Sequence, residues 1–383
     1  MKKKVAVLGA GGSIGRGALD VIRERKDLFE GALFAVDKNL NCLEELFKEF
    51  PTARFAAVSA DKDAASEGLK KRLYCGKDAV LRALEDVKPD AVVNGVSGAA
   101  GLLPSLKAVE IGCNLALANK ESVVMAWDII KEAAQKSGSV VIPVDSECSA
   151  IFNLVNQTGK ENLRRIILTA SGGPFRDASL EELREVDVEK ALRHPTWKMG
   201  PKITLDSSTL ANKGLEVIQI SKIMEVSPSI IDVSVHRQSI VHSLISLKDG
   251  AVYAALSKPD MRLPIHQALH YPLCESSRWG EMDFENDSPL SLTFEKPDCE
   301  KFPLLPLAFH AAKAGGFYPA AYNAANEIAD ERFIKGDASF LDIPKITASV
   351  LEADWAAKDK SLTLEAVLEA DSAARRMAWS VKC

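Results

Sequence analysis

The stretch Leu8-Gly9-Ala10-Gly11-Gly12-Ser13-Ile14-Gly15 decides the fold. It follows the apolar run Lys4–Leu8 and leads into the helical pattern Ile14–Arg25. Glycines allow a tight turn and let the backbone approach a pyrophosphate, and the new helix presents free N–H groups and a positive dipole end. We predict a dinucleotide-binding turn over residues 9–14. A strand-to-helix turn without a ligand is the alternative.

The same pattern of strand and helix continues outward from this turn to about residue 144. Its intervals are long enough for crossover helices, so we expect a parallel sheet with helices on both faces, a Rossmann-like dinucleotide-binding domain over residues 1–144. The apolar runs are Lys4–Leu8, Ala32–Val36, Phe55–Val58, Ala91–Asn94, Asn114–Ala118 and Ser139–Val144.

The rest of the chain divides into a central α/β region, a connecting segment and a helical region. Residues 145–275 suggest a catalytic α/β (α+β) domain with a mixed sheet, whose hairpin turns at Lys248-Asp249-Gly250. Residues 276–299 lack periodicity and form a linker, and residues 300–383 carry four amphipathic helices, a C-terminal four-helix bundle. The central strands are expected at Arg165–Ala170, Lys202–Leu205, Ile231–Val235, Ser239–Leu247 and Ala251–Leu256.

The composition excludes several classes of protein. The chain has 383 residues, 47% hydrophobic and 26% charged, with a formal net charge of −5, which excludes disorder and predicts no nucleic-acid partner. Its longest uncharged stretch is too short and too polar to span a membrane. Seven scattered cysteines without a Cys-x-x-Cys pair favour a reducing cytoplasm. We expect a cytoplasmic enzyme that acts on a small molecule.

Two segments at the ends of predicted strands are candidates for contacts with the cofactor and the substrate. Asp37 follows the second strand and favours NAD, whereas Lys38 beside Asn39 favours the extra phosphate of NADP, so the residues leave this preference open. Ala118-Asn119-Lys120-Glu121-Ser122 follows the fifth strand, at the edge where such sheets bind ligands. Lys120 there meets an oxygen-rich substrate or is a surface charge.

Asp145-Ser146-Glu147 closes the sixth strand. In an extended segment, residues two apart point to the same side, so both carboxylates are expected to converge. Hard oxygen ligands suit Mg²⁺ or Mn²⁺. A solvated acidic turn is the alternative.

Two further segments are candidates for a phosphate clamp. Ser171-Gly172-Gly173 ends a strand in a glycine turn, and Asp206-Ser207-Ser208-Thr209 leads into a helix that carries Asn212, Lys213 and Glu216. Hydroxyls, an amide and a lysine suit a phosphate, and Glu216 supplies a third carboxylate. Each segment alone is equally typical of a capped helix or a turn.

The loop from His194 to Gly200 contains Trp197 and is bounded by Pro and Gly, which indicates a lid over the substrate or a loop packed on its own domain. His236 and His242 are interpreted as structural histidines.

Together these segments resemble the 1-deoxy-D-xylulose 5-phosphate reductoisomerase family. The similarity runs in order through nearly the whole chain. It includes the glycine turn, Leu117–Ser122, Pro143–Glu147, Thr169–Arg176, His194–Gly200, Asn212–Glu216, Lys258–Arg262, Leu292–Glu295 and Asn323–Glu327.

The resemblance implies a divalent-metal-dependent and NADPH-dependent homodimeric enzyme that rearranges and reduces 1-deoxy-D-xylulose 5-phosphate to 2-C-methyl-D-erythritol 4-phosphate, by retro-aldol and aldol steps. It is an enzyme of isoprenoid precursor biosynthesis. Mg²⁺ or Mn²⁺ is expected, with Co²⁺ as a further candidate.

By motif match, three carboxylates hold the metal: Asp145, Glu147 and Glu216. The substrate contacts implied are Ser146, Glu147, Lys120, Ser171, Ser207, Asn212, Lys213, Glu216, His194 and Trp197. The cofactor residues implied are Gly9, Ala10, Gly11, Gly12, Ser13, Ile14, Lys38, Asn39, Asn119, Glu121 and Gly200. The catalytic residues implied are Lys120, Asp145, Glu147, Glu216 and His194.

Five positions depart from the family's pattern: Asp37, Cys148, Thr196, Gln219 and Arg237. The family generally has Gly, His, Asn, Glu and Pro there, so strict preference for NADPH is placed in doubt while the implied metal ligands remain. Two alternatives stay open, a related dehydrogenase of another phosphorylated sugar and a catalytically silent nucleotide-binding regulator.

Overall fold

The fold is described from a computed structural model, which describes residues 1–193, 197, 199–286, 290–357 and 362–383. The chain divides into two compact units. The first comprises Met1–Ser122, Asp128–Asp145 and Asp260–Gly280, and the second comprises Val123–Trp127, Ser146–Pro259 and Glu281–Cys383. The division into domains at residues 144, 275 and 299 stays a prediction.

The first unit is built on a seven-stranded parallel sheet in the order β4-β3-β2-β1-β5-β6-β7. This confirms the Rossmann-like class. The strands are β1 (Lys3–Leu8), β2 (Phe29–Val36), β3 (Arg54–Ala57), β4 (Leu73–Cys75), β5 (Ala91–Asn94), β6 (Asn114–Leu117) and β7 (Val141–Pro143). Sequence analysis missed β4, because three residues at a sheet edge carry too little apolar pattern.

The helices of the sheet region fill the predicted crossovers. They are α1 (Ser13–Glu24), α2 (Leu40–Glu49), α3 (Glu67–Lys70), α4 (Ala79–Val87), α5 (Leu102–Glu110) and α6 (Lys120–Ser137). A later helix, α12 (Arg262–His270), packs against α1 and returns to this unit. Lys3 Nζ donates to the Leu269 carbonyl at 2.8 Å, so this return is tied by a hydrogen bond.

The second unit contains a four-stranded sheet in the order β11-β10-β8-β9. Strands β8 and β9 are parallel, and β10 is antiparallel to both β8 and β11, so the predicted mixed sheet and its hairpin are confirmed. The strands are β8 (Leu163–Ala170), β9 (Ile231–Val235), β10 (Val241–Leu247) and β11 (Val252–Leu256).

The predicted strand at Lys202–Leu205 is wrong, because these residues belong to α10. Gly200 is the N-cap and Pro201 is the first helical residue, a position that suits the fixed φ of proline. The alternation of apolar and polar residues was too short to separate a strand from a buried helix. The helices before β9 are α7 (Ser146–Thr158), α8 (Leu180–Arg184), α9 (Val188–Ala191), α10 (Pro201–Ser208) and α11 (Ala211–Ile223).

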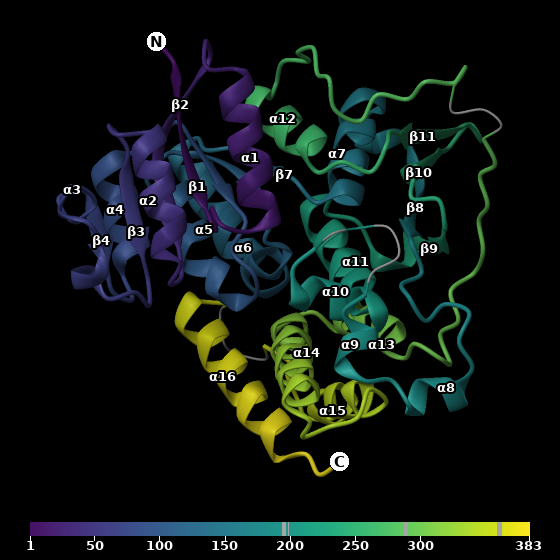
Figure 1. Ribbon diagram of the computed structural model, residues 1–383. Helices are drawn as coiled ribbons and strands as arrows, with labels where there is room; N and C mark the ends of the chain where they lie inside the picture. The colour runs from purple at the N-terminus through teal and green to yellow at the C-terminus, as the bar shows by residue number, and fades with distance from the viewer. Residues whose placement is uncertain (194–196, 198, 287–289, 358–361) are drawn as a thin grey trace. The chain divides into compact units, whose positions relative to one another are not determined.

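All four expected C-terminal helices are present among the described residues. They are α13 (Leu304–Ala314), α14 (Tyr318–Lys335), α15 (Asp342–Leu351) and α16 (Leu364–Ser380). Helix α14 contacts α13, α15 and α16 (Figure 1). Short 3-10 turns occur at Lys62–Ala64, Ala99–Gly101, Lys160–Asn162 and Pro228–Ile230.

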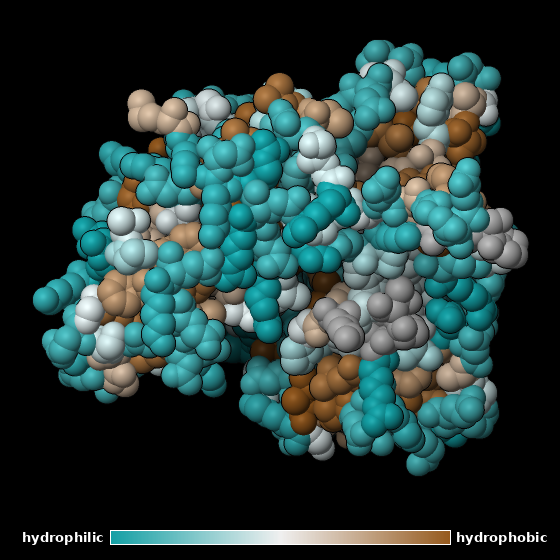
Figure 2. Space-filling view, turned by 45° about the horizontal axis from the view of Figure 1, so that its top comes forward, coloured by the Kyte–Doolittle hydropathy of each residue, from teal (hydrophilic) through white to brown (hydrophobic). Residues whose placement is uncertain are grey.

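The visible surface is mostly hydrophilic, with hydrophobic side chains in separate patches (Figure 2). Within the described part of the chain, no helix has the length and apolar character needed to cross a membrane.

Candidate active site

Three carboxylates gather where the chain passes from β7 into α7. One oxygen each from Asp145, Glu147 and Glu216 lies within 4.8 Å of the others, the one such group of three acidic, His or Cys side chains among the described residues. The expected extended segment at Asp145–Glu147 is wrong, since α7 already begins at Ser146. The carboxylates converge because a bend places Asp145 beside the first helical turn.

This cluster has the features of a cation site. Asp145 and Glu216 are 7% and 1% exposed, and Asp145 Oδ1 is buried without a hydrogen-bond partner among the described residues. A buried carboxylate oxygen without a partner is costly unless a cation or donor satisfies it. Three carboxylates are hard oxygen ligands of the kind that Mg²⁺ and Mn²⁺ prefer. The residues therefore fit a divalent ion.

Two buried lysines accompany the carboxylates. Lys120, at the start of α6, pairs with Asp145 and is 4% exposed, so it is not a surface charge. Lys213 Nζ lies 3.0 Å from Glu147 Oε1 and 2.5 Å from Glu216 Oε2. Three negative and two positive groups leave a negative balance that favours an added cation.

Polar neighbours orient the same carboxylates. Asn212 Nδ2 donates to Glu216 Oε1 at 2.5 Å, and the Ser146 hydroxyl donates to Glu147 Oε2 at 2.5 Å. Both donors belong to the set that sequence analysis predicted for the substrate. The structure thus brings Ser146, Asn212 and Lys213 together with two of the predicted metal ligands.

The predicted glycine turn after β8 lies against the end of α10. Gly172 and Gly173 have φ of +84° and +70°, values that favour glycine. A Cβ on Gly173 would lie 2.4 Å from the Ser207 carbonyl oxygen, so glycine is required for this approach. The Ser171 turn and Ser207 are therefore neighbours although 36 positions separate them in the sequence. The Ser207 hydroxyl donates to the Ile203 carbonyl at 2.8 Å.

Helix α11 packs closely against α13 at Gly214, and this contact sets the distance between the two helices. A Cβ on Gly214 would lie 2.6 Å from Ala308 Cβ and 2.7 Å from the Tyr322 hydroxyl oxygen. Tyr322 is fully buried and donates to the Leu304 carbonyl at 3.1 Å. Because Gly214 lies between Lys213 and Glu216, this contact positions both side chains.

The glycine turn after β1 has the geometry that sequence analysis predicted. Gly12 is the N-cap of α1 and provides no side-chain cap, so the first N–H groups of the helix remain for a ligand. A Cβ on Gly9 would lie 2.8 Å from the Gly95 carbonyl oxygen, which places the turn between β1 and β5. Strand order reverses there, the usual dinucleotide crevice. The turn contains Gly9, Ala10, Gly11, Gly12, Ser13 and Ile14.

The second predicted cofactor segment lies across from this turn. A Cβ on Gly11 would lie 3.9 Å from Asn39 Nδ2, so Asn39 faces the glycines. Asp37, Lys38 and Asn39 are exposed after β2, and Asn39 also accepts from the Cys42 N–H as the cap of α2.

Asn119 and Glu121 are buried in a network beneath the loop after β5. Asn119 Nδ2 donates to the carbonyls of Val96 and Gly98, both at 2.8 Å. Glu121 Oε1 accepts from the Gly98 N–H at 3.2 Å. These side chains hold the loop in place, a function that sequence analysis did not anticipate.

The predicted lid is described only in part. His194 and Thr196 lie outside the described residues, while Gly200 caps α10. The half-buried Trp197 has its ring centroid 6.3 Å from that of His242. Burial lowers the pKa of His242, whose Nε2 lies 3.2 Å from the Ser257 carbonyl oxygen. His236 accepts from the N–H groups of Ile240 and Val241, as expected of a structural histidine.

Three of the departing positions have distinct environments. Cys148 is fully buried in α7. Gln219 is also fully buried, and neither of its amide atoms has a partner among the described residues. Arg237 forms paired hydrogen bonds with Asp177 and Glu295, which raise its pKa.

Three family models match the chain in succession. Residues 5–127 match 1-deoxy-D-xylulose 5-phosphate reductoisomerase, residues 141–224 match the 1-deoxy-D-xylulose 5-phosphate reductoisomerase C-terminal domain, and residues 256–377 match the DXP reductoisomerase C-terminal domain.

Individual proteins match along the whole chain. 1-deoxy-D-xylulose 5-phosphate reductoisomerase of Treponema denticola is 46% identical over 377 residues, which cover 98% of this chain and 96% of the relative. A crystal structure of DOX-P reductoisomerase in complex with NADPH, fosmidomycin and magnesium is 34% identical, with a TM-score of 0.88 and coverage of 99% of this chain and 98% of that chain. The Zymomonas mobilis reductoisomerase in complex with NADPH is 37% identical, with a TM-score of 0.87 and the same coverage. This chain therefore belongs to the 1-deoxy-D-xylulose 5-phosphate reductoisomerase family.

Proposed function

We propose that this protein converts 1-deoxy-D-xylulose 5-phosphate to 2-C-methyl-D-erythritol 4-phosphate with NADPH and a divalent metal. The observation that carries the proposal is the group of three carboxylates, the buried Asp145 and Glu216 with the half-buried Glu147, in which one Asp145 oxygen has no partner among the described residues. Family membership and relatives whose structures contain NADPH and magnesium support it.

Asp145, Glu147 and Glu216 would hold the metal. A divalent ion bound there would polarise the substrate carbonyl and offset negative charge as it develops. Lys120 and Ser146 lie at this cluster, where an ammonium and a hydroxyl would orient the substrate oxygens.

Ser171, Ser207, Asn212 and Lys213 would bind the substrate phosphate. Support comes from the contact between Gly173 and the Ser207 backbone and from the position of Asn212 and Lys213 at the start of α11. The positive end of that helix favours an anion. Trp197 would cover the substrate, and His194, which lies three positions earlier in the sequence, would contact it.

The residues of the glycine turn, with Lys38 and Asn39, would bind the dinucleotide, and Gly200, Asn119 and Glu121 would border it. NADPH would supply the hydride for reduction. The short approach of Gly11 to Asn39 supports a shared cradle, while the buried Asn119 and Glu121 would shape its wall.

The decisive experiment follows NADPH oxidation with 1-deoxy-D-xylulose 5-phosphate and Mg²⁺, and identifies the product by mass spectrometry. Turnover that stops with Asp145→Asn and with chelator is expected. Absence of turnover by the folded wild type, or full turnover by Asp145→Asn, would refute the assignment. An exposed-acid variant, Asp249→Asn, serves as the matched control because Asp249 lies in the hairpin turn.

We also propose a homodimer in the cytoplasm. Strand β11 is an edge strand, and its Val252, Tyr253 and Leu256 are 58%, 47% and 38% exposed. An apolar edge strand is a liability unless another surface covers it, and a second copy is the simplest cover. A cytoplasmic location is supported by seven cysteines that are all free. Sedimentation of the wild type and Tyr253→Lys tests the dimer, which the variant should weaken.

A further inference from the structure

Helix α14 carries polar side chains on a face that helices normally fill with apolar ones. Asn323, Asn326, Glu327 and Asp330 follow the spacing i, i+3, i+4 and i+7, the pattern of a core-facing stripe. Asn323 and Asn326 are fully buried and Asp330 is 3% exposed. A polar stripe in a core needs specific partners, because an unpaired buried polar group is costly.

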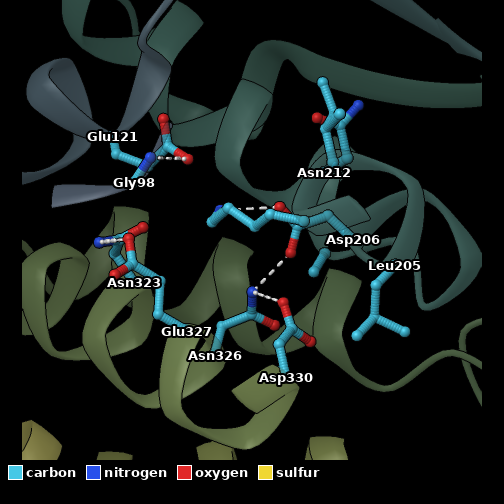
Figure 3. A network of polar contacts seen from close by, with 12 residues as sticks. Gly98, Glu121, Leu205, Asp206, Asn212, Asn323, Asn326, Glu327 and Asp330 are labelled. Carbon is cyan, nitrogen blue, oxygen red and sulfur yellow. Dashed lines mark hydrogen bonds and ion pairs between the residues drawn. The ribbon is translucent and has the colours of Figure 1, made fainter. Parts of the chain in front are cut away.

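Asn326, in the middle of this stripe, has its partner on α10. Asn326 Nδ2 donates to Asp206 Oδ1 at 2.7 Å and to Asp330 Oδ2 at 3.4 Å (Figure 3). Lys202 Nζ donates to Asp206 Oδ2 at 2.8 Å. The bond from Asn326 joins residues 120 positions apart. The amide is thus the bridge between α10 and the C-terminal helices.

The charges around this bridge do not balance if both acids are ionised. Asp206 is 2% exposed and has Lys202 as its cation, whereas no described cation is bonded to Asp330. The other charged group of this face, Glu327, pairs with Arg375 of α16 at 2.5 Å. Tyr322 is the remaining titratable neighbour, and burial keeps it neutral by raising its pKa.

Two buried carboxylates that share one ammonium cannot both hold a negative charge cheaply. Burial is the largest cause that raises the pKa of Asp330, followed by the charge of Asp206. Asp330 Oδ1 is also buried without a partner among the described residues. A neutral carboxyl at Asp330 removes the cost of an unpaired charge.

We propose that Asp330 is protonated beside Asp206, which pairs with Lys202, and that the bridge from Asp206 through Asn326 to Asp330 positions Ser207 in the substrate-phosphate site. This inference rests on the proposed function. Asp206 and Ser207 are adjacent in α10. The Asp206 side chain is bonded to Asn326 of α14, and the Ser207 backbone lies against the turn at Gly173. Asp206, Asn326 and Asp330 are positioning residues.

The kinetic test compares Asp206→Asn, Asn326→Ala and Asp330→Asn with the wild type. Breaking the bridge should raise KM for the sugar phosphate about tenfold in Asp206→Asn and Asn326→Ala while kcat changes less than about threefold, the sign of lost substrate binding. Asp330→Asn, a neutral isostere, should keep KM within about twofold. The matched control is Asn323→Ala, whose amide bonds Glu327 instead.

The protonation test is spectroscopic and independent of turnover. The infrared difference spectrum of wild type minus Asp330→Asn at neutral pH should contain the C=O stretch of a carboxylic acid, shifted in D₂O. Absence of that band, an unchanged KM in folded Asn326→Ala, or an equal rise of KM in Asn323→Ala would overturn the inference. If the wild type does not turn over this sugar phosphate, the proposed function fails. The dissociation constant of inorganic phosphate, compared among the same variants, then replaces KM.

Discussion

The ammonium group of Lys213 lies 2.5 Å from a carboxylate oxygen of Glu216, one turn away on the same helix. The same group lies 3.0 Å from Glu147. A lysine proposed for the substrate phosphate thus contacts two proposed metal ligands. Its charge opposes a bound cation and attracts a bound phosphate, so one residue couples the two ligands.

Replacing Lys213 should therefore change the affinities for metal and substrate in opposite directions. Lys213→Gln is expected to raise KM for the sugar phosphate by about tenfold or more and to tighten Mg²⁺ binding by about threefold, because a repulsive charge is removed. Calorimetry with Mg²⁺ and initial rates would measure both. Lys222→Gln, farther along α11, is the control. Weaker Mg²⁺ binding by Lys213→Gln would contradict this account.

Gly214→Ala should destabilise the second unit. The added methyl group would lie 2.6 Å from Ala308 Cβ, so α11 must move away from α13, at a cost of about 1–3 kcal/mol in the free energy of unfolding. Activity should fall as well, because α11 carries Asn212, Lys213 and Glu216. Urea unfolding measures the first effect. The free energy of unfolding should recover in part when Gly214→Ala is combined with Ala308→Gly. If Gly214→Ala alone is as stable as the wild type, the contact between α11 and α13 is looser than the structure indicates.

Gln219→Leu should leave the protein as stable or make it more stable. Both amide atoms of Gln219 are buried without partners among the described residues, and an apolar side chain of similar size avoids that desolvation cost, worth about 1 kcal/mol. Thermal and urea unfolding would check this. Gln267→Leu is a suitable comparison, since Gln267 is exposed on α12. A loss of stability by Gln219→Leu would point to an unrecognised hydrogen-bond partner.

Asp37→Gly should strengthen the preference for NADPH over NADH. Asp37 is exposed at the end of β2 beside Lys38, where a carboxylate repels an adenosine phosphate. The ratio of kcat/KM for NADPH to that for NADH is expected to rise about tenfold. Asp61→Gly provides a comparison at another exposed acid. An unchanged ratio would mean that the carboxylate lies away from the phosphate.

Mild acid should destabilise the first unit through His266. Burial lowers the pKa of His266 to about 4, below the ordinary value of about 6.5. Between these two pH values the unfolded chain binds more protons than the folded chain. The contribution of His266 to the free energy of unfolding is therefore complete above about pH 6.5 and is lost as the pH falls toward about 4. His270, whose ring centroid lies 4.0 Å away, has a pKa lowered by burial too. Urea unfolding across this window should give a shallower fall for His266→Phe, and the exposed His310→Gln should keep the original slope.

The sequence by itself determined most of the local elements, and it indicated which residue types form the candidate site. The glycine turn after β1, the parallel strands and the four C-terminal helices follow from residue patterns within short windows. The motif order also indicated the family. These features depend on interactions among neighbours in the chain, and local pattern therefore predicts them.

Only the tertiary structure decided how distant residues meet. Helix α10 replaces the expected strand because burial against α14 makes a short apolar pattern ambiguous. Glu216 joins Asp145 through the packing of α7 and α11, and Gly214 is required by the closeness of α13. Asn326 finds Asp206 across 120 positions. Such contacts have no local signature, because their energy comes from excluding water between segments that the chain brings together only on folding.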